Sequence, residues 1–208
     1  MNSTLKFLIG IGSAIVIVIG TLFAVNALST VTRYTSEVYQ ERIELQYYAA
    51  KDELVEAVDN YISSIAPAST MNGLAFVEKC DKYNVDIRFV LAQAQLESHF
   101  ATTGLGGKMN SAFNVGAFDG KGTAHMTKYK HPDFSIEPFL QLITTHYLVD
   151  GKTESDMMKN YVNTEGKRYA TFEGYEDKLF KIYSTIVTNT NITAAYNSYK
   201  KHRILAAQ

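Results

Sequence analysis

The chain has 208 residues, of which 46% are hydrophobic, and a formal net charge of −1 at pH 7. This length and apolar fraction suffice for one packed globular domain with accessory segments. Because the charge is balanced, the sequence has no basic excess, which argues against nucleic-acid binding. The single cysteine, Cys80, has no partner for an internal disulfide or a zinc knuckle, so we interpret it as a small buried hydrophobic residue.

The first predicted element is an uncharged apolar run over residues 7–28, FLIGIGSAIVIVIGTLFAVNAL. One helix needs about 20 such residues to cross a membrane, so the run predicts a transmembrane signal anchor within residues 1–30. Lys6 is the only basic residue before the run, which favours a cytoplasmic N-terminus with the rest of the chain outside. A cleavable signal peptide is the alternative, because Val25-Asn26-Ala27 resembles a cleavage site, although the run is longer than a usual signal-peptide core.

Residues 31–66 contain no Gly or Pro and predict one long helical stalk that ends before Pro67. Apolar residues follow 3,4 spacing along it, but three acids fall on the same row. The apolar positions are Val31, Tyr34, Val38, Leu45, Tyr48, Val55 and Ile62, and the acids are Glu41, Asp52 and Asp59. Two interpretations stay open: weak self-association through a loose coiled coil, or packing of the last turns, at Leu54, Val58 and Ile62, on the following domain.

The rest of the chain predicts a mainly helical domain over residues 67–190 and a C-terminal helical tail over 191–208. Ser69 is the expected N-cap of the first domain helix, and Asn84 or Asp86 of the second. Later helices are predicted after Ser135 and at about 154–162 and 174–188. Between the second and third, residues 113–129 predict a short β-hairpin with its turn at 119–122, DGKG.

Glu97 lies near the end of the second domain helix, on the flank of its apolar stripe. A carboxylate beside apolar side chains is penalised by desolvation when charged, so its pKa rises and it can hold a proton near neutral pH, as a general acid must. The alternative is that Glu97 caps the loop at residues 104–107 by accepting its N–H groups. A helix-terminal Glu beside a small hairpin in a mainly helical domain is the layout of a lysozyme-like α+β glycosidase.

Four segments resemble, in order, the motifs of the glucosaminidase family of peptidoglycan hydrolases, glycoside hydrolase family 73. They are LAQAQLESHF, SAFNVGAF, MTKYKHPDFSIEPFLQLI and RYATFEGYEDKLFKIY, spread over residues 91–183. The resemblance implies a lysozyme-like fold that cleaves N-acetylglucosaminyl β-1,4 linkages in peptidoglycan glycan strands. It places the catalytic acid on Glu97 and a cleft tyrosine on Tyr169, and it implies substrate-binding roles for Phe100, Phe113, Asn114 and Tyr129.

The sequence departs from the family pattern at the second catalytic acid, because residues 98–132 contain no Glu and one Asp, Asp119. The second group is therefore open between three choices. Asp119 or Asp133 acts as base or nucleophile, the substrate's own 2-acetamido group attacks, or polar groups such as Tyr169 hold a water molecule. The chain also has no Trp but 14 Tyr, whose rings offer apolar faces to sugars.

We predict no cofactor and no metal, because the histidines lack HExxH or HxH spacing and have no cysteine nearby. Two rival functions remain. One is a lytic transglycosylase or muramidase of the same fold, and the other is a phage virion or envelope protein that binds glycan without cleaving it. In each case the domain is expected outside the cytoplasmic membrane, on the periplasmic or cell-wall side, in a bacterial or phage-encoded protein.

Overall fold

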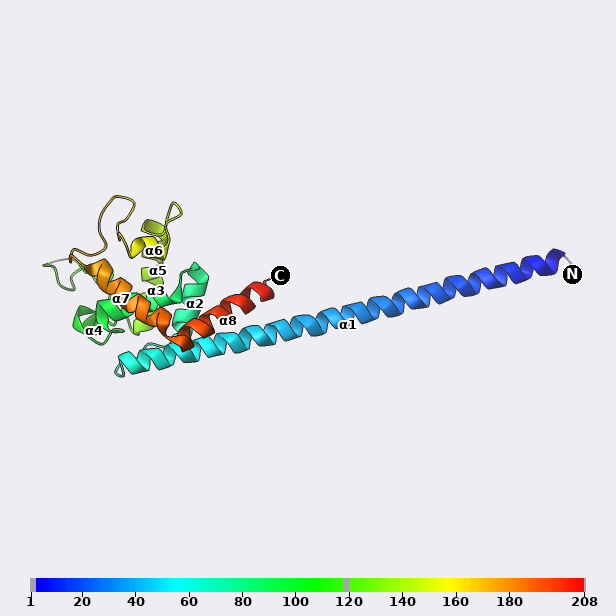
Figure 1. Ribbon diagram of the computed structural model, residues 1–208, viewed down its shortest axis with the longest axis horizontal. Coiled ribbons are helices and arrows are strands. Elements are labelled where there is room, and N and C mark those ends of the chain that lie inside the picture. The colour runs from blue at the N-terminus through cyan, green and yellow to red at the C-terminus, as the bar shows by residue number, and fades with distance from the viewer. Residues whose placement is uncertain (1–2, 118–119, 208) are drawn as a thin grey trace.

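The computed structural model describes residues 3–117 and 120–207, without the side chains of residues 3–20, 23 and 24. The first element, α1 (Ser3–Ile65), is one continuous helix of 63 residues. Its length is about 95 Å at 1.5 Å per residue. Figure 1 shows the other helices gathered around its C-terminal end. The described chain is mainly helical, as the sequence predicts.

The structure leaves the predicted membrane span largely outside its description. Among the residues that were described, no helix is both long enough and apolar enough to cross a membrane. Most of the run 7–28 falls on positions whose side chains the structure does not describe. The anchor therefore stays a prediction.

The domain is built from short helices joined by tight connections. In chain order they are α2 (Gly73–Tyr83), α3 (Ile87–Ser98), α4 (Gly104–Met109), the 3-10 helix η1 (Pro132–Ser135), α5 (Ile136–His146), α6 (Glu154–Met157), α7 (Tyr175–Thr188) and α8 (Thr190–Ala206). The predicted helices after Ser135 and at 174–188 correspond to α5 and α7, and the predicted tail corresponds to α8.

The helix starts were predicted in part. Asp86 caps α3 by accepting the Arg88 N–H, as one of the two predicted alternatives has it. The prediction for α2 is wrong, because its N-cap is Asn72, whose side chain accepts the Ala75 N–H. The expected cap, Ser69, donates its hydroxyl to the Phe100 carbonyl at 2.8 Å instead.

The predicted hairpin at residues 113–129 is not present in the described part of that segment, which forms turns and irregular backbone with a single bridge residue at Gly122. The returning chain pairs with the end of α4, since the Tyr129 N–H donates to the Met109 carbonyl at 3.0 Å. The Asn110 side chain then donates to the Tyr129 carbonyl at 2.9 Å. These bonds use the backbone groups that a strand ladder would need. Asp119 lies outside the described residues.

The helix predicted at 154–162 is also wrong beyond Met157, because the chain doubles back there as an antiparallel pair. The Tyr169 N–H donates to the Tyr161 carbonyl at 2.8 Å, and the Asn163 N–H donates to the Lys167 carbonyl at 2.9 Å. The Asn163 side chain closes the turn by accepting the N–H groups of Glu165 and Lys167. An Asn that bonds the backbone just ahead of it favours a turn over a helix.

The last turns of α1 belong to the core of the domain, which confirms the second interpretation of the stalk. Leu54, Val58 and Ile62 are buried, and α8 runs beside this part of α1 (Figure 1). α2 approaches α1 so closely that the Gly73 N–H donates to the Asp59 carboxylate at 2.5 Å. A Cβ at Gly73 would lie 2.4 Å from the Val55 carbonyl oxygen, so only glycine fits this contact.

Candidate active site

Glu97 lies in the last turn of α3, where the helix ends at Ser98. The residue as a whole is partly exposed. Asn114 donates from Nδ2 to Glu97 Oε2 at 3.0 Å and to the Glu97 backbone carbonyl at 2.7 Å. This pair of bonds fixes both the carboxylate and the helix end that carries it.

The other oxygen of Glu97 is bonded from α7 and from α3 itself. The Tyr175 hydroxyl donates to Glu97 Oε1. Gln93 Nε2 donates to the Tyr175 hydroxyl and lies 3.4 Å from the same carboxylate oxygen. Within the described residues the carboxylate is thus bonded by side chains. The N–H groups of residues 104–107 are not among its partners, because this stretch forms α4. The loop-capping alternative for Glu97 is therefore wrong.

Burial raises the pKa of Glu97 above its ordinary value, and the hydrogen bonds from Tyr175 and Asn114 oppose that rise only in part. The direction agrees with the expectation from the apolar flank of α3. A Glu with a raised pKa holds its proton closer to neutral pH, and it can donate that proton to a leaving oxygen.

The chain reverses direction directly after α3 through three left-handed residues that are not glycine. His99, Phe100 and Ala101 have φ values of 52°, 55° and 61°. Each costs about 1–2 kcal/mol relative to ordinary backbone. The Phe100 N–H bonds the Ala94 carbonyl at 3.1 Å, and the Ala101 N–H bonds the Ser98 hydroxyl at 2.8 Å. These bonds end α3 sharply beside Glu97.

The C-terminal end of α1 supports this reversal from outside. The His99 ring nitrogen Nε2 lies 2.9 Å from the Ile65 carbonyl oxygen. The Ser69 hydroxyl, just past the end of α1, donates to the Phe100 carbonyl at 2.8 Å. The stalk therefore contributes to the site as well as to the core, because its end holds the strained turn that positions Glu97.

α4 packs against the same helix end through Gly106. A Cβ at this position would lie 2.4 Å from the Ser98 Cβ, 2.5 Å from the Ser111 carbonyl oxygen and 3.0 Å from Asn114 Oδ1. The first two neighbours are fixed atoms that cannot swing away, so the contact requires glycine.

We expect Gly106→Ala to lower the free energy of unfolding by about 1–3 kcal/mol, the usual cost of overpacking a core. It should also loosen Asn114 from Glu97. Urea unfolding of the purified protein measures the first effect. Lys108→Ala, at an exposed position of the same helix, is the control and should leave the midpoint unchanged. Equal midpoints for Gly106→Ala and the wild type would contradict the contact.

Tyr169, predicted from the resemblance, lies in an aromatic cluster next to Glu97. Its ring stacks on Tyr161 with centroids 4.4 Å apart and lies 5.8 Å from the ring of Tyr175. Its hydroxyl donates to the Phe113 carbonyl at 3.2 Å. Tyr169 thus braces the backbone next to Asn114, the residue that binds Glu97.

The predicted substrate-binding residues occupy different environments. Phe113 and Phe100 are fully buried; Phe113 stacks on Phe139 with centroids 4.1 Å apart. A side chain without exposed surface cannot contact a glycan, so in this conformation both residues are part of the core that supports the site. Asn114 contacts Glu97 directly, and Tyr129 is partly exposed.

Asp133, one of the alternatives for the second carboxylate, is occupied by structural contacts. It accepts the Asn72 backbone N–H at 3.3 Å and is bonded by the Asn72 side chain. His131 Nδ1 lies 3.2 Å from its other oxygen. Asp133 therefore ties η1 to the start of α2, a positioning role.

Gln93 and Tyr175 are site residues that sequence reasoning missed. A signal existed for Gln93, because it precedes Glu97 by one helical turn and is a fully buried amide within an apolar helix. In the described part of the chain, Gln93 Oε1, Asn114 Oδ1 and the Tyr161 hydroxyl are buried without a hydrogen-bond partner. Unpaired buried polar atoms cost free energy and are typical of functional sites. No group of three metal-ligating side chains occurs among the described residues.

No curated protein matches the chain. A family model described as mannosyl-glycoprotein endo-beta-N-acetylglucosaminidase matches residues 73–188, which is more than half of the chain and includes Gln93, Glu97, Asn114 and Tyr175. The chain therefore belongs to this glucosaminidase family, whose members are glycoside hydrolases that act on peptidoglycan.

Proposed function

We propose that the protein cleaves N-acetylglucosaminyl β-1,4 linkages in peptidoglycan glycan strands, with Glu97 as the general acid. The observation that carries the proposal is the largely buried carboxylate of Glu97, held by Tyr175 and Asn114 at the end of α3. Glu97 gives its proton to the glycosidic oxygen as the bond to the sugar's anomeric carbon breaks, and the leaving sugar departs as a neutral alcohol. A lysozyme-like arrangement of the domain is part of this proposal.

Product analysis tests the linkage that is cut. The full chain is incubated with purified sacculi, because the end of α1 lies in the domain core, and the released muropeptides are identified by mass spectrometry. Reducing N-acetylglucosamine ends are expected. Reducing N-acetylmuramic acid would indicate a muramidase, and the anhydro form a lytic transglycosylase. Absence of turnover by folded protein would favour a glycan-binding module.

The second catalytic group is proposed to be water or the substrate's 2-acetamido group, with Tyr169 in support. In this proposal Asp119, which lies outside the described residues, has no catalytic role. The Tyr169 hydroxyl donates to the Phe113 carbonyl. Phe113 directly precedes Asn114, whose side chain bonds Glu97.

We expect Tyr169→Phe to cost more activity than Asp119→Asn, which should stay within about tenfold of the wild type, well below the loss typical of removing an acid–base group. Both variants are assayed on the same sacculi after unfolding measurements establish that they are folded. A larger loss for Asp119→Asn than for Tyr169→Phe would instead support a mechanism with two carboxylates, Glu97 and Asp119.

The location is proposed from residues 7–28, which carry no charge. We expect the full chain to fractionate with membranes and to resist an alkaline wash, because burying about 20 apolar residues holds a helix in the bilayer. The chain lacking residues 1–30 should be soluble and active, since it keeps the part of α1 that packs on the domain. Recovery of a soluble mature protein that begins near Leu28 would indicate a cleaved signal peptide instead.

A further inference from the structure

The stalk carries an exposed apolar row on the side of α1 that faces away from the domain. This row consists of Val31, Tyr34, Val38, Leu45 and Tyr48, whose exposed fractions lie between 47% and 67%. We call these five residues the stalk row. None of them is among the residues buried in the core.

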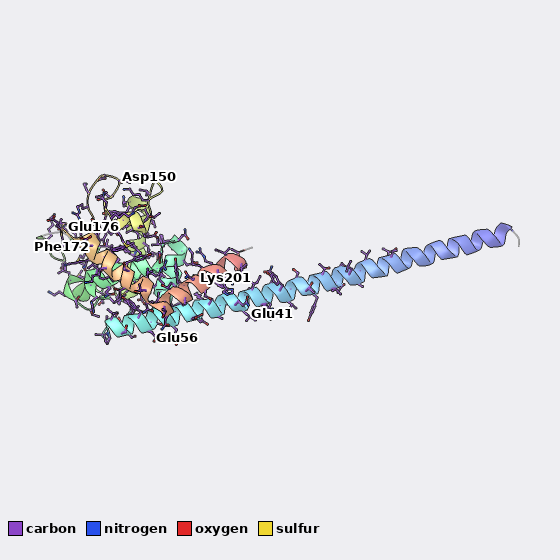
Figure 2. The ribbon with its side chains drawn as sticks, viewed as in Figure 1. Glu41, Glu56, Asp150, Phe172, Glu176 and Lys201 are labelled. Carbon is purple, nitrogen blue, oxygen red and sulfur yellow. The ribbon has the colours of Figure 1, made fainter. Side chains whose placement is uncertain are left out.

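Helix geometry places the stalk row opposite the packed face of α1. Leu45 and the buried Leu54 are separated by about two and a half turns at 3.6 residues per turn, so they point in opposite directions. In Figure 2, Glu41 lies on one side of α1, and α8 with its residue Lys201 lies on the other side. Packing on the domain takes Ile62 out of the predicted heptad row, but it leaves the five residues of the stalk row exposed.

We propose that the stalk row is an interface between two copies of this chain, which form a parallel two-stranded coiled coil over residues 31–48. In this register Val31, Val38 and Leu45 occupy heptad position a of both helices. β-branched residues at a favour two strands over higher oligomers. Tyr34 and Tyr48 occupy position d, with Glu41 between them. The row is self-complementary, as a twofold interface requires.

Charge complementarity supports the parallel register. Glu37 falls at position g, and Arg42 falls at position e of the following heptad. In a parallel pair, Glu37 of each helix faces Arg42 of the other, which gives two attractive contacts across the seam. In the single chain Glu37 pairs with Arg33 at 2.9 Å, but both side chains are mostly exposed and such pairs are weak.

Beyond Tyr48 the heptad row continues into the part of α1 that contacts the domain. Asp59 lies on the same heptad row, but it accepts the Gly73 N–H at the start of α2. The domain and α8 occupy the opposite side of α1 along the packed turns (Figure 1). A second helix can therefore lie along residues 31–48 without meeting either domain.

The parallel orientation rests on the proposed anchor. Two chains anchored in one membrane leave it on the same side, and confinement to the membrane raises their effective concentration. This matters because the interface is short, about two and a half heptads, and carries Glu41 at position d, where its two copies repel. The bilayer does not reach the outer part of the row, because Val38 and Leu45 lie about 15 and 25 Å beyond Leu28 at 1.5 Å per residue.

Cysteine cross-linking of the full chain in membranes tests the interface. Val38→Cys places a thiol at the seam, and Ser36→Cys places one on the opposite side of the same helical turn. Both parent residues are exposed, and the native Cys80 is buried. Under a mild oxidant, Val38→Cys is expected to give a disulfide-linked dimer at least about tenfold faster than Ser36→Cys, because only seam positions approach within disulfide range.

A second variant is expected to increase the dimer fraction, which random collisions between chains would not do. Glu41→Leu in the Val38→Cys background should increase the dimer fraction, since it removes the repulsion at position d, and glycan cleavage should be unchanged. Equal cross-linking of the two cysteine variants, no dimer from Val38→Cys in membrane-bound protein, or linkage to another protein would overturn the proposal. Membrane fractionation is read separately, so a failed anchor is distinguished from a failed interface.

Discussion

Glu97→Gln is expected to abolish glycan cleavage while the fold stays intact. The amide keeps the volume of the side chain. Its oxygen can still accept from Asn114 and its NH2 group can donate to the Tyr175 hydroxyl, but it cannot release a proton to the leaving oxygen. Removing a general acid costs about 10²–10⁴-fold in rate. The measurement is the release of reducing ends from purified sacculi by the full chain.

The matched control for this variant is Glu78→Gln, at a side chain that pairs with Lys51 at 2.9 Å and is about half exposed. It makes the same chemical change outside the Glu97 network and should leave the rate unchanged. Unfolding curves of both variants should superimpose on that of the wild type within about 1 kcal/mol, because neither change alters packing. Release of reducing ends by Glu97→Gln at the wild-type rate would remove Glu97 from the mechanism.

Helix α3, which carries Glu97, was predictable because its signals are local. The 3.6-residue apolar period of α3, its Asp86 cap and the flank position of Glu97 all lie within one short stretch of sequence. The direction of the Glu97 pKa shift follows from the same stretch, since burial on an apolar face is its largest cause. Local patterns therefore predicted the helix that carries Glu97 and the direction of its pKa shift, whereas the role of Glu97 as the acid is a proposal.

The partners of Glu97 were less predictable because they arrive from distant parts of the chain. Tyr175 is one of 14 tyrosines, and no spacing rule distinguishes it from the tyrosines that only pack. Its role follows from the contact between α3 and α7, which brings its hydroxyl to Glu97 Oε1. Only tertiary packing identifies such a residue.

The two errors in secondary structure have the same kind of cause. In the segment 113–129, the turn residues DGKG favour a hairpin, but the backbone groups of Tyr129 find partners at the end of α4. Beyond Met157, Asn163 draws the chain into a turn through its side chain. Both segments are short and lack a strong apolar period, so hydrogen bonds that the pattern does not reveal decide their structure. In the first segment these are bonds to the end of α4, and in the second they are local bonds within the turn.

The stalk illustrates a different limit of sequence reasoning. Three acids interrupt its heptad row, and the row was interpreted as one continuous face. In the structure Asp59 bonds the start of α2, while Leu54 and Val58 pack into the core from the other side of the helix. Different faces of this helix therefore have different surroundings along its length. A single heptad pattern applied to the whole helix does not show this difference.

Tyr175→Phe is expected to move the alkaline limb of the pH–rate profile to higher pH and to lower the maximal rate. The Tyr175 hydroxyl donates to the carboxylate of Glu97, and a bond to the charged form lowers the pKa of that group. Without the bond the pKa of Glu97 rises further. Because a general acid works in its protonated form, activity is present below its pKa and is lost as the pH rises through it.

The fall in maximal rate has a separate cause, since Glu97 also loses the group that orients Oε1. A hydrogen bond to a charged group contributes about 1.5–3 kcal/mol, so the expected loss is about ten- to hundredfold. Packing is preserved, because the phenyl ring keeps the contacts of Tyr175 with Tyr161 and Tyr169. Initial rates on sacculi between about pH 4 and 9, the range that spans a raised Glu pKa, measure both effects.

Tyr183→Phe is the matched control, because Tyr183 lies on the same helix, α7, and its hydroxyl donates to another carboxylate, Asp86, at 3.3 Å. It removes an equivalent hydroxyl at the start of α3 rather than at its catalytic end, so the pH profile should not move. If Tyr175→Phe lowered the rate without moving the alkaline limb, Tyr175 would act through packing alone. A shift of that limb to lower pH would mean that Tyr175 stabilises the protonated acid, the reverse of the role assigned here.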